Sequence, residues 1–118
     1  MTKGTRFRVL ADYEVHDPHP LQLPEGSEVT ILRSDMSWPG WLWVKAGRQT
    51  GWIPASCLTV TSPGPGRTSQ AFDGTELSAR CGEILEGLEE APGWVLARRA
   101  TGETGWFPLF NLKPHQHT

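Results

Sequence analysis

Short apolar runs dominate the chain, and glycine, proline, serine and aspartate separate them. The clearest runs lie at residues 7–10, 29–32, 41–44 and 51–53. Runs of this length between turn-forming residues are typical of β-strands. No window of eleven residues free of glycine and proline keeps a 3.6-residue apolar period, so helix is confined to a weak turn after Pro54 or Pro108. The pattern predicts an all-β fold.

The strand pattern occurs twice in the chain. Gly51-Trp52-Ile53-Pro54 returns as Gly105-Trp106-Phe107-Pro108, and each phrase follows another tryptophan, Trp41 or Trp94. Upstream, the stretch that begins at Leu21 matches the stretch that begins 56 positions later at Leu77. Insertions fall only between the matching apolar runs, as expected of a duplicated fold with variable loops. The repeat predicts two small modules.

The repeat also sets the expected boundaries. We expect one domain at residues 5–60, a Pro/Gly linker at 61–66, a second domain at 67–113 and a disordered tail at 114–118. Each domain is near the lower size at which a core is stable without metals or disulfides. The linker is too short to let the modules drift far apart.

Tryptophan content and charge narrow the function classes. The chain has 6 tryptophans in 118 residues, too many for small cores to bury, and surface aromatic residues favour contact sites. The net charge of −2 without a basic face argues against nucleic-acid binding. No apolar run is long enough to span a membrane and the N-terminus has no signal-peptide segment, so we expect a cytoplasmic protein. Cys57 and Cys81 do not correspond in the repeat and are expected to be free thiols.

Chemistry-bearing side chains are sparse. His16, Asp17 and His19 cluster in one proline-constrained loop and His115 and His117 lie in the tail, an arrangement that does not predict the four convergent ligands of a zinc site. No nucleophile has a recognisable motif around it, and no glycine-rich loop precedes a helix. The sequence therefore predicts no metal, no cofactor and no enzymatic activity.

The residues carry a family resemblance. The first repeat resembles the Src homology 3 (SH3) domain over residues 6–60 through Leu10-Ala11-Asp12-Tyr13-Glu14, Leu21, Gly26, Trp41, Ile53, Pro54 and Leu58. Residues 67–113 resemble a divergent member through Ala71-Phe72-Asp73, Glu76-Leu77-Ser78, Trp94, the second Gly-Trp phrase and Leu112. The whole is most similar to the bacterial tandem variants. The resemblance implies two five-stranded antiparallel barrels in tandem.

SH3 domains use an aromatic groove for proline-rich segments, because a polyproline II helix is already extended and loses little entropy on docking. The resemblance implies that one pocket is walled by Tyr13, Trp41 and Pro54, and the other by Phe72, Trp94 and Pro108. Ala11 and Cys57 in the first repeat, and Gln70 and Asn111 in the second, stand where the family has tyrosines. The second proline-accepting pocket of each groove has therefore lost its aromatic rings.

Other residues near the grooves have two interpretations. Asp17, Asp73 and Glu76 would each pair with a ligand arginine or are solvated loop charges. The turn at Pro39-Gly40 would hold Trp38 beside Trp41 as a two-ring platform, or Trp38 packs against the core edge or the second repeat. Trp52 and Trp106 lie near the groove rim, where packing between modules and ligand contact are equally expected. The candidate peptide-binding residues are Tyr13, Asp17, Trp38, Trp41, Trp52, Pro54, Phe72, Asp73, Glu76, Trp94, Trp106 and Pro108.

Three functional hypotheses follow. The first is a non-enzymatic module that captures an extended peptide of a protein partner, with proline-rich segments included. The second is a structural scaffold whose tryptophans pack between domains or in a dimer. The third is glycan or nucleic-acid binding by a small barrel. The sequence leaves the ligand and the oligomeric state open.

Overall fold

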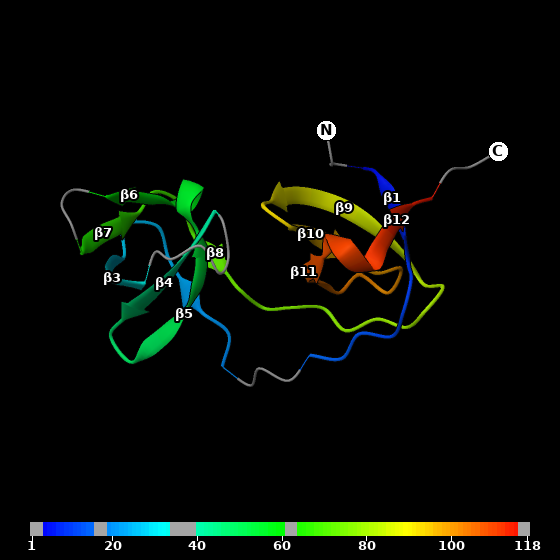
Figure 1. Ribbon diagram of the computed structural model, residues 1–118, viewed down its shortest axis with the longest axis horizontal. Coiled ribbons are helices and arrows are strands. Elements are labelled where there is room, and N and C mark those ends of the chain that lie inside the picture. The colour runs from blue at the N-terminus through cyan, green and yellow to red at the C-terminus, as the bar shows by residue number, and fades with distance from the viewer. Residues whose placement is uncertain (1–3, 16–18, 34–39, 61–63, 116–118) are drawn as a thin grey trace. The chain divides into compact units, whose positions relative to one another are not determined.

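The computed structural model describes residues 4–15, 19–33, 40–60 and 64–115, and over these ranges it confirms the all-β prediction (Figure 1). A short 3₁₀ turn follows each repeated proline, as predicted: η1 is Ala55–Cys57 and η2 is Leu109–Asn111. The strands are β1 Arg6–Val9, β2 Gln22–Leu23, β3 Glu28–Arg33, β4 Trp41–Ala46, β5 Gln49–Pro54, β6 Leu58–Val60, β7 Pro65–Thr68, β8 Phe72–Asp73, β9 Ile84–Ala91, β10 Trp94–Arg98, β11 Thr104–Pro108 and β12 Leu112–Pro114.

The strands form two curled five-stranded antiparallel sheets. One has the order β11-β10-β9-β1-β12 and the other the order β5-β4-β3-β7-β6, while β2 and β8 make a small two-stranded sheet. Residues Met1–Asp17 and Glu76–Thr118 make one compact unit, here called unit 1, and Pro18–Thr75 make unit 2. Each curled sheet is consistent with an SH3-like barrel.

The two units do not coincide with the two repeats. In unit 1, β1 of the first repeat lies between β9 and β12 of the second, as the blue, yellow and red ribbons of Figure 1 show. In unit 2, β7 of the second repeat lies between β3 and β6 of the first. The opening strands of the repeats are thus reciprocally exchanged. The domains expected at 5–60 and 67–113 are repeats of sequence, and each compact unit combines segments of both.

The expected linker explains part of this difference. β6 and β7 form an antiparallel hairpin in which Leu58 faces Thr68 and Val60 faces Gly66. Pro65 and Gly66 of the expected linker belong to β7, so only residues 61–64 separate β6 from β7 along the chain. Because a connection of this length brings the strands on either side of it together, β7 stays in the sheet of the first repeat.

The expected tail begins later than predicted. Pro114 is the last residue of β12, and the backbone N–H of His115 donates to the Arg6 carbonyl at 2.8 Å. The reason is that the start of β1 pairs with these residues, since Phe7 faces Pro114 across the β1–β12 ladder. Residues 116–118 of the predicted tail lie outside the described residues.

The repeated glycine of the Gly-Trp phrase allows a close backbone approach in both units. A Cβ on Gly105 would stand 2.9 Å from the backbone of Glu76 and Leu77, and one on Gly51 would stand 3.1 Å from the Leu21 Cβ. Only glycine leaves room for these neighbours. The glycine thereby brings residues 76 and 77 of the second repeat beside β11.

Buried apolar side chains form a core in each unit. In unit 1 the core residues are Val9, Leu77, Ala79, Leu85, Val95, Ala97, Phe107 and Leu112. In unit 2 the buried side chains include Leu21, Leu23, Val29, Val44 and Ile53, together with the hydroxyl of Thr68. That hydroxyl donates to the Pro24 carbonyl and accepts the Ser27 N–H, both at 2.8 Å, so no polar atom is left unsatisfied there.

Candidate functional site

The strand exchange decides which predicted groove residues share a unit. Tyr13 lies in unit 1 with Trp94 and Pro108, whereas Trp41 and Pro54 lie in unit 2. The pocket expected from Tyr13, Trp41 and Pro54 is therefore not assembled within one unit. The reason is that Tyr13 follows β1, and β1 belongs to the sheet of the second repeat.

Tyr13 is held by three neighbours in unit 1. Its N–H donates to the Ala79 carbonyl at 2.8 Å, and the Ala79 N–H donates back at 3.0 Å. Its ring meets the Phe107 ring edge-on, with centroids 5.1 Å apart and an interplanar angle of 64°. Its hydroxyl donates to Oε1 of Glu76 at 2.6 Å. Burial, and then the Glu76 carboxylate, raise the pKa of Tyr13 well above its usual value, so the phenol stays a neutral donor.

The predicted acidic partners of a ligand arginine have contacts of their own. Oε1 of Glu76 accepts the Tyr13 hydroxyl. Oδ1 of Asp73 accepts the backbone N–H of Thr75 at 2.9 Å and its hydroxyl at 2.6 Å, which shapes an Asx turn. Asp17 lies outside the described residues. Glu76 and Asp73 therefore have a structural role in addition to any ligand contact.

The aromatic residues of unit 2 pack on one another. Phe72 takes the place beside Trp41, with ring centroids 6.3 Å apart, and the two are only 6% and 8% exposed. Pro54 faces Trp41 across the β4–β5 ladder and is fully buried. Trp52 meets Trp43 edge-on at 5.3 Å. Trp38 lies outside the described residues.

Alternation along β4 does not divide the strand as expected. In a half-buried strand, alternate side chains, here Trp41 with Trp43 or Leu42 with Val44, would lie in the core and the others toward solvent. Instead, Trp41 and Val44 are buried and Leu42 and Trp43 are half-buried. The outer face is covered too, because Trp52 packs on Trp43 across the ladder.

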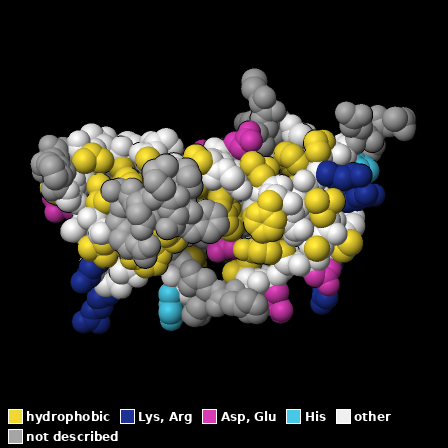
Figure 2. Space-filling model, viewed as in Figure 1, with side chains coloured by type: hydrophobic (Ala, Val, Ile, Leu, Met, Phe, Trp, Pro, Cys, Tyr) yellow, Lys and Arg dark blue, Asp and Glu magenta, His cyan; other side chains and the backbone are white. Residues whose placement is uncertain are grey.

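In unit 1 an aromatic residue that the sequence analysis did not single out is the most exposed. Phe110, in the middle of η2, is 78% exposed, whereas Trp106 is 7% exposed and Pro108 is fully buried. Trp94 faces Pro108 across the β10–β11 ladder and is half-buried. Hydrophobic side chains gather over β11 and η2 in Figure 2. The signal in the sequence is an aromatic residue two positions after Pro108, where the first repeat has Ser56.

Polar contacts replace the lost tyrosine rings. The side-chain amide of Asn111 accepts the Ala11 N–H at 3.1 Å and donates to the Ala11 carbonyl at 2.8 Å. Nε2 of Gln70 donates to Sγ of Cys57 at 3.3 Å. Each contact joins an opening segment of one repeat to the 3₁₀ turn of the other. These positions therefore connect the exchanged segments and supply no aromatic wall.

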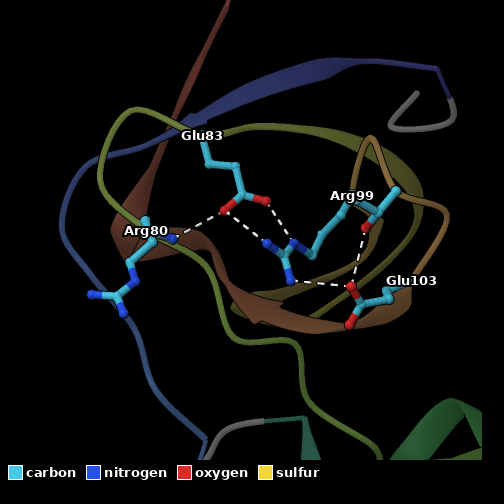
Figure 3. Close-up of polar contacts among 5 residues, drawn as sticks. Arg80, Glu83, Arg99 and Glu103 are labelled. Carbon is cyan, nitrogen blue, oxygen red and sulfur yellow. Dashed lines mark hydrogen bonds and ion pairs between the residues drawn. The ribbon is translucent and has the colours of Figure 1, made fainter.

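A hollow on unit 1 is lined mainly by polar and charged residues. Its volume is about 250 Å³, and it is lined by Asp12, Tyr13, Glu14, Ser78, Ala79, Arg80 and Arg99. Figure 3 shows the Arg99 guanidinium between two carboxylates: Nε donates to Glu83 at 2.6 Å and one terminal nitrogen to Glu103 at 3.2 Å. The hydrogen bond that Arg99 donates to the Glu83 carboxylate raises the pKa of Arg99. Arg99 is thus engaged within the fold.

Two further findings concern the described residues. Within residues 4–15, 19–33, 40–60 and 64–115, no three histidine, cysteine, aspartate or glutamate side chains come close enough together to hold a metal ion. In the same part of the chain, no helix is sufficiently long and apolar to cross a membrane.

Comparison with known proteins supports the SH3 resemblance of the first repeat. Residues 6–61 match the family of the variant SH3 domain. The SH3 and PX domain-containing protein 2B of mouse and human are 27% and 26% identical to this chain over 92% of its length. The epidermal growth factor receptor kinase substrate 8-like protein 3 of mouse is 35% identical over 50% of the chain.

The chain is short beside these relatives: it aligns with 13% of the length of the first two and with 11% of the third. Residues 6–61 are thus similar to the variant SH3 domain, and the mouse and human SH3 and PX domain-containing proteins contain SH3 domains by name. SH3 domains are protein-interaction modules.

Proposed function

We propose that this chain is a non-enzymatic binding protein of two SH3-like barrels in tandem, and that it captures an extended peptide segment of a protein partner. The observation that carries the proposal is the exposure of Phe110, 78%, in the turn after Pro108. Tyr13 and Trp94 of the same unit are half-buried. Unit 1 therefore exposes an aromatic ring, whereas the described aromatic rings of unit 2 are buried or half-buried.

The chemistry of these residues favours an extended peptide. Flat rings give contact area at low conformational cost, and a polyproline II segment brings its own extended backbone. The second carboxylate oxygen of Glu76, beside Tyr13, would pair with an arginine of such a ligand. The net charge of −2 argues against nucleic acid as the partner. Cys57 and Cys81 are not joined by a disulfide, which fits a reducing, cytoplasmic setting.

A structural role is the second candidate, and the burial of the tryptophans favours it in unit 2. Trp41 is 8% exposed and packs on Phe72, and Trp43 packs on Trp52. These rings contribute to the core and the sheet surface of their own unit. Under this proposal, unit 2 supports the chain while unit 1 contacts the ligand.

Indole NMR during peptide titration tests the proposal. Proline-rich peptides with and without arginine are added to the full chain, and the Trp94 and Trp41 indole signals are followed. We expect shifts at Trp94, weakened by Phe110→Ala and unchanged in the control Val60→Ala, an exposed apolar residue of unit 2. Absence of any shift up to millimolar peptide, or equal loss in both variants, would contradict peptide capture by unit 1.

A further inference from the structure

The duplicated sequence allows two ways of pairing its segments. Each opening segment, residues 6–15 or 65–74, could complete the barrel of its own repeat or that of the other, because the two segments occupy equivalent places. Tyr13 and Phe72 are equivalent at a separation of 59 positions, and the segments that follow are equivalent at 56. For each contact in the structure, these equivalences therefore name the residues that would meet in the unexchanged pairing.

The hydrogen bond of Tyr13 distinguishes the two pairings. In the structure its hydroxyl donates to Glu76 at 2.6 Å. In the unexchanged pairing Tyr13 would meet Pro20, which stands 56 positions before Glu76 and offers no side-chain acceptor. Phe72, which has no hydroxyl, would then meet the Glu76 carboxylate. A buried polar group without a partner is costly, so this difference favours the exchange.

The ion pair between Asp12 and Arg80 also favours the exchanged pairing. Oδ1 of Asp12 accepts the Cys81 N–H at 2.7 Å, and Oδ2 lies 3.5 Å from the Arg80 guanidinium. Unexchanged, Asp12 would face Pro24, the equivalent of Arg80, and Arg80 would face Ala71, the equivalent of Asp12. The pair is exposed and contributes little energy, but it exists only when the segments are exchanged.

Side-chain volumes also match only across the repeats. A Cβ on Gly66 would be 3.6 Å from Val29 and 3.8 Å from Ile31, so these branched side chains fill the space beside the glycine. In unit 1 the equivalent position is Phe7, which pairs with Leu85 and stands diagonal to Gly87 in the ladder.

Without the exchange these volumes would be mismatched. Phe7 would meet Val29 and Ile31, while Gly66 would meet Gly87, since Gly87 is the equivalent of Ile31. One site would be overpacked and the other would hold a void, and both are destabilising.

We propose that these side chains select the exchanged pairing, so that the two repeats are an obligate pair and each barrel is completed by the opening segment of the other repeat. The contacts of Tyr13, Asp12 and Phe7 all act in the same direction. The short connection between β6 and β7 adds to them, because it keeps β7 beside β6. This inference does not depend on which ligand the chain binds.

A disulfide trap tests the pairing in the full chain. Arg8 faces Lys113 across the β1–β12 ladder, and Arg67, the equivalent of Arg8, faces Thr59 across the β7–β6 ladder. Directly opposed Cα atoms in such a ladder lie about 5.5 Å apart, within the range of a disulfide. The exchanged pairing therefore joins Arg8→Cys to Lys113→Cys, and the unexchanged pairing joins Arg8→Cys to Thr59→Cys.

Both double variants are made in a Cys81→Ser background, since Cys81 is an exposed thiol. After mild oxidation at low protein concentration, we expect an intrachain 8–113 link by peptide mapping and a reduced 8/59 variant. An 8–59 link, an absent 8–113 link, or disulfide-linked dimers would each overturn the proposal. Peptide binding plays no part in this readout, so it can fail independently of the proposed function.

The single tyrosine supplies a second readout without engineered cysteines. In the exchanged pairing, Glu76→Gln lowers the pH at which Tyr13 ionises, because the carboxylate beside the phenol is removed. The ultraviolet absorbance of the phenolate follows this titration, with Glu28→Gln as the control. A Tyr13 titration that Glu76→Gln leaves unchanged would overturn the proposal.

Discussion

Unit 1 and unit 2 have the same strand arrangement but different surfaces at the corresponding place. In unit 2, Trp41 and Phe72 bury each other's rings. In unit 1, Tyr13 is fixed by Glu76 and remains half-buried, and Phe110 is exposed. The difference teaches that a few substitutions at equivalent positions of a repeated sequence are enough to leave an aromatic ring exposed in one unit and to bury the aromatic pair of the other.

The largest expected effect concerns the two repeated glycines. Gly105→Ala would place a Cβ 2.9 Å from backbone atoms of Glu76 and Leu77, which cannot move alone, whereas the Cβ of Gly51→Ala would meet the Leu21 side chain at 3.1 Å. We expect Gly105→Ala to lower the free energy of unfolding by about 3 kcal/mol, the upper end for overpacking, and Gly51→Ala by about 1 kcal/mol. Urea unfolding measures both, and equal losses would show that the two units tolerate the change alike.

The next largest expected effect on the free energy of unfolding is that of Tyr13→Phe in unit 1. Tyr13→Phe leaves the Glu76 carboxylate without its donor, and we expect a loss of about 1 to 2 kcal/mol of unfolding free energy. Phe72→Tyr is the matched change in unit 2, where Pro20 stands at the position equivalent to Glu76. Recovery of the loss in the double variant Tyr13→Phe/Glu76→Leu, followed by denaturant unfolding, would identify the hydrogen bond as its cause. A Tyr13→Phe protein as stable as the parent would contradict this role.

A pH dependence sharpens the same comparison. The folded-state pKa of Tyr13 is raised, first by burial and then by Glu76, above the value of about 10 that tyrosine has in unfolded chains. The stabilising contribution is therefore fully present below about pH 10 and is lost as pH rises above that value, because the unfolded chain then binds fewer protons than the native state. Unfolding free energies between pH 8 and 11 measure the slope. Tyr13→Phe should lose this part of the dependence, and a variant with the parent's slope would contradict the assignment.

The smallest expected effect on stability is that of Phe110→Ala. Phe110 is 78% exposed, so its removal should change the unfolding free energy by less than about 0.5 kcal/mol. Ser56→Phe places the same ring in η1 of unit 2 and tests whether the turn alone makes a contact surface. Peptide titration compares the three proteins. Enhanced binding by Phe110→Ala would contradict the role of this ring.

Much of the fold follows from the sequence pattern. The apolar runs and the turn residues between them predict strands, and the repeated prolines predict the positions of η1 and η2. These features depend on neighbours in the sequence, so they can be read without the tertiary structure. Family resemblance adds the curled five-stranded sheet.

The composition of the candidate site could be predicted only in part. Tyr13, Trp94 and Pro108 are candidates from their motifs, yet the motifs assign Tyr13 to the partners Trp41 and Pro54. Because the two repeats share one pattern, β1 fits the sheet of either, and local sequence does not decide between them. The exposure of Phe110 is likewise a property of the folded surface.

The sequence by itself determined the strand content, the duplication and the two turns, because short-range patterning and turn residues encode them locally. Only the tertiary structure decided that the opening strands are exchanged and that Tyr13 stands beside Glu76. The physical reason is that contacts between residues more than sixty positions apart depend on the matching of volumes, hydrogen bonds and charges across the repeats. Those matches become visible in the sequence only when the pairing of the strands is known.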